Sequence, residues 1–185
     1  MKPRPFPFLT LVGLALGLYL GDIEGSVYYS KEEAFELAFG KDKVDIENLP
    51  VFLSEEQVNQ IERLAKTRLD SPLFTFHVGK KEGVVQGYAA IDSQVVRSQA
   101  ETVLVVLDAK GKLQRTEILA FHEPPEYKTP GRWLEKLLNH PLNELVINQG
   151  IDGVSGATLS GKATLNSVRK TLAVFQVGAR EETRP

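Results

Sequence analysis

The chain has 185 residues, of which 42% are hydrophobic and 25% are charged, and its net charge is −2. These values are typical of one soluble globular domain, and without a basic excess we expect no nucleic acid partner. The absence of cysteine excludes disulfides, thiolate metal sites, iron–sulfur ligation and cysteine nucleophiles.

The N-terminal segment has the pattern of a secretory signal. Lys2 and Arg4 precede an apolar run over residues 6–20, and small and acidic residues follow it. The run is shorter than the roughly 20 residues of a membrane span. A buried core helix is the alternative, but the basic flank and the terminal position favour export. We therefore expect residues 1–25 to be a signal peptide, or an N-terminal membrane anchor if they are not cleaved.

The sequence pattern of residues 26–83 predicts a segment of helices and extended chain. Ser30 with Glu33 and Ser54 with Gln57 each form a capping-box pattern, which predicts helices over residues 30–40 and from residue 54 onward. Residues 44–53 between them are predicted to be extended, with Pro50 indicating an edge strand.

Two hairpins and a closing helix follow. The first pair of strands is predicted at residues 73–78 and 84–91, and the second at 102–107 and 113–121. Beyond a turn-rich stretch the pattern predicts, in order, a short helix through residues 133–138, a strand at 142–147, a glycine-rich loop, a helix at 159–177 and a polar tail at 178–185. This order predicts an α+β fold with a largely antiparallel sheet of two hairpins, flanking helices and a C-terminal helix.

The glycine-rich loop, DGVSGATLSGKA at residues 152–163, has three interpretations. The first is a P-loop, because residues 156–162 match its pattern. However, Ala163 stands where the Mg²⁺-binding hydroxyl is required, and too little chain follows to build the rest of a nucleotide-binding sheet. The second is a helix start without a ligand, in which Asp152-Gly153 makes a turn and Ser155 or Thr158 caps the helix.

The third interpretation comes from a resemblance. The residues from Asp152 to Thr158, DGVSGAT, resemble the flavinylation motif D-x-x-[ST]-G-A-[ST] of the FMN-binding domain family. That family includes exported subunits of Na⁺-translocating NADH:quinone reductase and of the Rnf complex. The resemblance covers residues 84–177, which we expect to form the FMN-binding domain, and the loop at residues 123–131 is also similar.

The resemblance implies a covalent cofactor on Thr158. In the family, the last threonine of the motif carries FMN through a phosphoester bond, which an FAD:protein FMN transferase installs with Mg²⁺. No histidine lies near Thr158 in sequence to activate its hydroxyl, so we expect an external transferase as a partner. A phosphodiester at this helix N-terminus would be stabilised by the helix dipole.

The candidate cofactor-binding residues extend beyond the threonine. They are Thr158, Asp152, Gly153, Ser155, Gly156, Ala157, Ser160, Lys162, Tyr127, Thr129 and Trp133. Tyr127 and Trp133 can stack on the flavin or simply belong to the core. A lysine such as Lys162 can stabilise an anionic reduced flavin or lie on the solvated surface. We expect no metal site and no catalytic residues.

The resulting hypothesis is an exported flavoprotein that carries electrons between membrane or periplasmic redox proteins. It is more an electron-transfer protein than an enzyme in its own right. Two alternatives stay open: a binding or assembly module whose loop is never flavinylated, and a small flavin-dependent reductase with its own substrate. A deep apolar pocket beside the flavin would favour the reductase.

Overall fold

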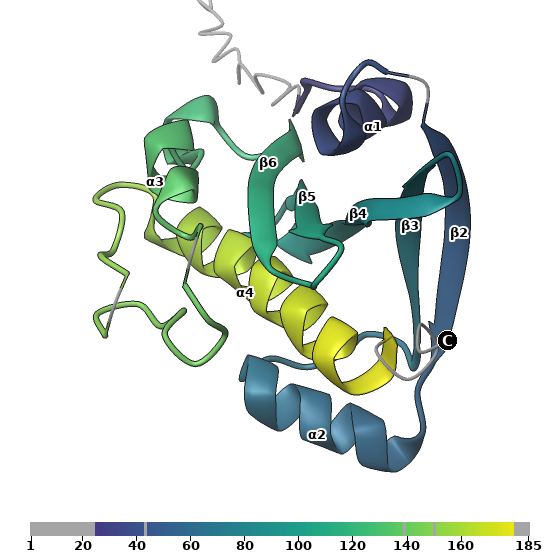
Figure 1. The fold of residues 1–185 in the computed structure, drawn as a ribbon. Coiled ribbons are helices and arrows are strands. Elements are labelled where there is room, and N and C mark those ends of the chain that lie inside the picture. The colour runs from purple at the N-terminus through teal and green to yellow at the C-terminus, as the bar shows by residue number, and fades with distance from the viewer. Residues whose placement is uncertain (1–24, 43, 139, 150, 180–185) are drawn as a thin grey trace, which may run out of the picture.

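A six-stranded antiparallel sheet forms the centre of the molecule (Figure 1). The computed structural model describes residues 25–42, 44–138, 140–149 and 151–179. The strands lie in the order β1-β6-β5-β4-β3-β2. Their bounds are β1 (Ser26–Val27), β2 (Asp45–Phe52), β3 (Leu73–Lys81), β4 (Val84–Val95), β5 (Ala100–Asp108) and β6 (Leu113–Phe121). The predicted α+β fold is confirmed.

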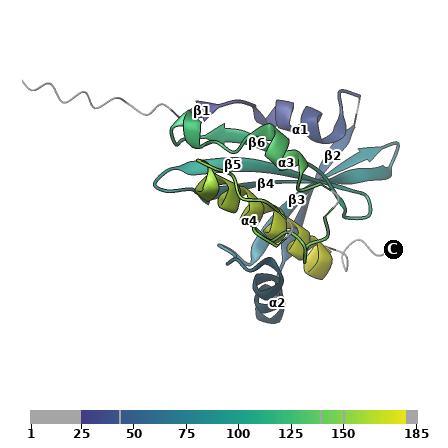
Figure 2. The same ribbon diagram turned by 90° about the vertical axis from the view of Figure 1, so that its left-hand side faces the viewer.

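In the described part of the chain four α-helices flank the sheet, with α1 on one face and α2 and α4 on the other (Figure 2). Their bounds are α1 (Lys31–Phe39), α2 (Glu55–Ala65), α3 (Gly131–Glu135) and α4 (Thr158–Val174). A 3₁₀ turn at Pro125–Tyr127 precedes α3, and a π-helical turn at Phe175–Ala179 extends α4. Among the described residues, no helix is long and apolar enough to cross a membrane. The predicted signal or anchor lies outside them, apart from Gly25.

Local sequence signals account for the first helices and the hairpins. Both capping boxes are present: the hydroxyls of Ser30 and Ser54 each accept a hydrogen bond from the backbone amide three residues later, at 3.2 Å. β3 and β4 meet at Glu82 and Gly83, which have φ angles of 52° and 77°. A two-residue turn with both angles positive matches the right-handed twist of the strands, so it closes this hairpin.

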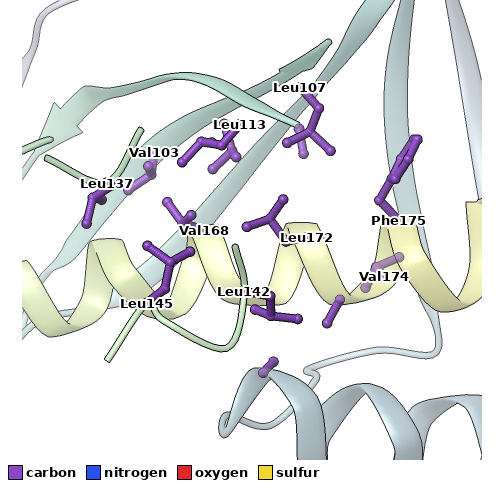
Figure 3. Packing of buried hydrophobic residues seen from close by; sticks show 14 of the residues in the cluster. Val103, Leu107, Leu113, Leu137, Leu142, Leu145, Val168, Leu172, Val174 and Phe175 are labelled. Carbon is purple, nitrogen blue, oxygen red and sulfur yellow. The ribbon is translucent and has the colours of Figure 1, made fainter. Parts of the chain in front are cut away.

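The main core lies between the sheet and α4 (Figure 3). Val103 and Leu107 of β5 face Val168 and Leu172 of α4, and all four are buried. The same cluster includes Ile61 of α2 and residues of β2 and β3. A smaller cluster on the other face packs under α1. Residues 26–83 therefore contribute strands and core to the same sheet that carries the C-terminal half.

The predicted strand at residues 142–147 is wrong. The segment forms turns, with a single bridge between Ile147 and Ile151. Its apolar signal arises because Leu142 and Leu145 are buried against α4 (Figure 3). The position beside β6 is taken instead by β1, which pairs Ser26 with Phe121 and which the sequence did not predict. A buried loop and a strand share the same short apolar pattern, so periodicity could not separate them.

Candidate functional site

The motif loop leads directly into α4, as predicted, and leaves the helix entrance open. Gly156 has a φ of 80°, and a Cβ there would meet no atom within 4 Å. Because positive φ suits glycine, this residue lets the chain turn sharply into the helix. Ala157 is the N-cap residue, and it offers no side-chain hydrogen bond. The cap by Ser155 or Thr158 that the ligand-free interpretation requires is not formed, and within the described residues no side chain caps the first-turn amides.

Thr158 is exposed at the first position of α4. Its hydroxyl donates a hydrogen bond of 3.0 Å to the carbonyl oxygen of Val154, inside the motif. This bond fixes the side chain while leaving it on the surface. Gly153 and Ser155 on the approaching loop are also exposed. The Thr158 side chain is therefore accessible from solvent.

Ser160 lies two residues further on, in the opposite environment. It is 1% exposed, and its hydroxyl lies 3.0 Å from the carbonyl oxygen of Ala157 and in contact with that of Tyr127. Thr129, also 1% exposed, donates a hydrogen bond to the Ser160 oxygen at 3.0 Å. These bonds connect the loop before α3 to the first turn of α4. The hydroxyls of Thr129 and Ser160 therefore have a structural role in the site.

An open hollow of about 220 Å³ lies beside Thr158. Its walls come from the start of α4, the 3₁₀ turn and the β4–β5 turn. They comprise Val96, Arg97, Tyr127 and residues 156–160. Arg97 stacks over the Tyr127 ring, with its guanidinium carbon 5.1 Å from the ring centroid. The hollow thus offers an aromatic ring, a cation and apolar side chains next to the exposed threonine.

Glu123 holds the β4–β5 turn in place. One carboxylate oxygen accepts hydrogen bonds from the backbone amides of Arg97, Ser98 and Gln99, at 3.1, 2.7 and 2.9 Å. These amide bonds, first those of Ser98 and Gln99, hold the pKa of Glu123 below its usual range. The carboxylate therefore fixes the backbone that carries Arg97 into the hollow.

Trp133 supports the motif loop from behind. It is buried, and its indole nitrogen donates a hydrogen bond of 2.7 Å to the carbonyl oxygen of Asp152. Gly161 packs close to it, and a Cβ there would make an ordinary van der Waals contact with the indole at 3.6 Å. The Asp152 carboxylate is exposed and lies 3.4 Å from Lys136. The structure therefore brings Tyr127 to the hollow, while Trp133 packs outside its lining.

The remaining candidates lie around the site. Lys162 is exposed on α4 and does not line the hollow. Lys128 lies over the Tyr28 ring at 3.5 Å, and burial lowers its pKa. No group of three potential metal ligands occurs among the described residues. The sequence did not indicate Val96, Arg97 or Leu159 as lining residues. The position of Val96 and Arg97 depends on the β4–β5 turn lying against the start of α4, which no local pattern encodes.

A comparison with protein families identifies this region. Residues 98–173, which include the motif, match the model of the FMN-binding domain. Residues 98–173 are identified as an FMN-binding domain. The match confirms the suspected family and supports a flavin-binding role in electron transfer. It begins in the β4–β5 turn and ends in α4, so it covers most of the hollow's lining. No curated protein and no solved structure matches the chain.

The residues present fit an FMN attached through its phosphate. Thr158 supplies a reachable hydroxyl, the uncapped first turn of α4 favours an anion, and Tyr127 and Arg97 offer a surface for a flat ring. The hollow is smaller than the about 300–1,000 Å³ of pockets that enclose a ligand. A flavin held there would keep part of its ring in solvent.

Proposed function

We propose that the chain is an exported flavoprotein electron carrier whose FMN is esterified to Thr158. The observation that carries the proposal is the exposed Thr158 hydroxyl, set beside a shallow hollow within the FMN-binding domain. The flavin would supply the redox chemistry, while the protein fixes its position and its electrostatic surroundings.

Attachment requires a separate enzyme. The hydroxyl of Thr158 attacks the FMN phosphorus of FAD. An oxygen–phosphorus bond to threonine forms, the pyrophosphate bond breaks, and AMP and a proton are released. Among the described residues, the Thr158 oxygen has only the carbonyl of Val154 as a hydrogen-bond partner, and a carbonyl is no general base. We therefore infer that an FAD:protein FMN transferase supplies both the base and the Mg²⁺.

The surroundings of the hollow favour electron transfer over substrate turnover. Its 220 Å³ leaves little room for a substrate beside a flavin. Leu159, which is 47% exposed, lines the hollow, and Val95, which is 69% exposed, directly precedes Val96 of the lining in sequence. Such exposed apolar side chains suit brief contact with a redox protein in the periplasm or at a membrane. The basic and apolar residues within the predicted signal or anchor segment, residues 1–25, provide the argument for export and for membrane anchoring.

Intact mass measurement after co-expression with a flavin transferase tests the attachment. We expect the mass to rise by one FMN less one water, and in-gel flavin fluorescence to follow the protein. Thr158→Ala should abolish both signals. Thr158→Ser, which keeps a hydroxyl at the same position and still satisfies the last position of the motif, is the matched control and should keep the added mass.

The alternatives give different results in the same experiment. An unmodified wild-type mass beside an active transferase, checked on a second substrate protein, would favour the binding module. Modification that survives in Thr158→Ala would place the flavin elsewhere. Flavinylated protein that oxidises or reduces a small substrate at enzymatic rates would support the reductase.

A further inference from the structure

A second hollow, of about 330 Å³, lies far from the flavin site, where α2 meets α4. Its lining includes three cationic side chains: Arg63 and Lys66 at the C-terminal end of α2, and Arg169 on α4. Asn143 and Gln176 add amide groups, and no acidic residue belongs to the lining. Arg169 is eleven residues beyond Thr158, or about 16 Å along the helix axis.

Arg169 is the unusual member of this group. Its side chain is only 6% exposed, and burial lowers the pKa of its guanidinium. One nitrogen, Nη2, donates a long hydrogen bond of 3.3 Å to the carbonyl oxygen of Leu64. Nε is buried and has no hydrogen-bond partner within the part of the chain that the structure describes. No ion pair of Arg169 is found there either.

A purely structural role explains only part of this arrangement. Leu64 lies in the last turn of α2, so Arg169 can serve as a cation at the C-terminal end of that helix. That role satisfies one of the five N–H donors of a guanidinium. A buried charged donor without an acceptor is costly, and such groups usually mark an unseen water or ion.

We propose that this hollow, the α2–α4 pocket, binds a small organic oxyanion, either a phosphate or a carboxylate. The Arg169 guanidinium would donate to the oxyanion, and Arg63 and Lys66 would complete a positive rim. Leu64 and Leu142 provide an apolar wall for the organic part of the ligand. The volume falls within the range of pockets that take small molecules. Binding would join α2, which precedes the family match, to α4 within it.

Titration with phenyl phosphate, followed by ¹⁵N NMR of the arginine Nε–H groups, tests the pocket in the full chain. Inorganic phosphate at matched ionic strength serves as the second probe. We expect the Arg169 Nε–H signal to shift saturably with a millimolar or lower Kd, and phenyl phosphate to bind more tightly than phosphate. Because the pocket is remote from Thr158, Thr158→Ala should bind equally well.

Variants at the exposed rim keep the test independent of folding. Arg63→Gln and Lys66→Gln should each weaken phenyl phosphate binding by several-fold, since a charge-assisted bond is lost. At the buried position, Arg169→Lys should weaken it by at least about tenfold, because lysine keeps the charge but lacks the planar, bidentate donors of the guanidinium. Arg68→Gln removes the same charge from an exposed residue outside the lining, so its affinity should stay within about twofold of wild type, as expected for a screened surface charge.

Two results would overturn the proposal. One is the absence of any Arg169 Nε–H shift with both probes, or shifts that the rim variants leave unchanged. The other concerns the chain's own carboxylates at Glu181 and Glu182. If binding appears only in a Glu181→Gln, Glu182→Gln variant, the pocket accepts the polypeptide's own tail and not a separate ligand.

Discussion

Thr158 and Ser160 carry similar hydroxyl groups but have opposite surroundings. The Thr158 oxygen lies at the surface with one intraloop hydrogen bond, whereas the Ser160 oxygen is enclosed by Thr129, Tyr127 and Ala157. A transferase needs room for a nucleotide around the attacking oxygen. Accessibility therefore selects Thr158, even though both residues lie at the entrance of the same helix.

Glu101 gives a prediction for the pH dependence of stability. It is fully buried in β5, where one carboxylate oxygen accepts a hydrogen bond of 2.8 Å from Thr164 and the other has no partner among the described residues. Burial raises the pKa of Glu101 to about 7, from an ordinary value of 4.5. Because the pKa of Glu101 is higher in the folded state than in the unfolded state, its protonated form favours folding. This contribution to stability is fully present below about pH 4.5 and is lost as the pH rises through about 7.

We expect Glu101→Gln to remove this loss. Glutamine keeps an acceptor for Thr164 and never ionises, so the variant should match wild type at low pH. Above about pH 7 it should be more stable by up to about 3 kcal/mol, which corresponds to the size of the pKa shift. Urea unfolding at several pH values measures the difference. A constant difference between the two proteins across this range would contradict the assignment.

The β4–β5 turn depends on a single carboxylate from another segment. Replacing Glu123 by glutamine should weaken its bonds to the amides of residues 97–99, because a charged acceptor becomes neutral. Amide hydrogen exchange at these three residues should become faster, while exchange in α4 stays slow. Glu126→Gln, a neighbouring acid without this role, is the control.

The same turn should also respond to pH. The pKa of Glu123 is lowered in the folded protein, so its stabilising effect is present at neutral pH and is lost as the pH falls through that lowered pKa. After correction for the intrinsic rate, wild-type exchange at residues 97–99 should therefore approach that of Glu123→Gln in acid. Identical exchange in both proteins at neutral pH would show that the carboxylate does not hold the turn.

Local sequence signals predicted the helices and turns better than the contacts between segments that are distant in sequence. The two capping boxes and the 82–83 turn act within a few residues, so the sequence revealed them directly. The predicted strand at residues 142–147 is wrong because burial of its leucines in the core gives this loop the apolar pattern of a strand. Likewise, the motif identified Thr158, but Arg97 reaches the hollow through a contact 26 residues apart in sequence, between its amide and Glu123. Contacts of this kind leave no local periodicity.

At the scale of the whole molecule, the family match covers only part of a continuous structure. Residues 98–173 contain β5, β6, α3 and all but the last residue of α4, whereas β1 to β4 complete the same sheet and α2 joins the main core. Val51, Phe76 and Ile61 are buried in that core, so the N-terminal half covers part of the sheet and of α4. The region of the family match thus shares one sheet and one core with the segment that precedes it.

The most direct test of the account is to locate the flavin within the polypeptide. Protein purified after co-expression with a flavin transferase would be digested, and its fluorescent peptide sequenced by tandem mass spectrometry. We predict one modified peptide, containing residues 155–162, with the added mass on Thr158 and none on Ser155 or Ser160. A flavin located on either serine, or on a peptide outside this loop, would contradict the claim that the exposed hydroxyl at the start of α4 is the site of attachment.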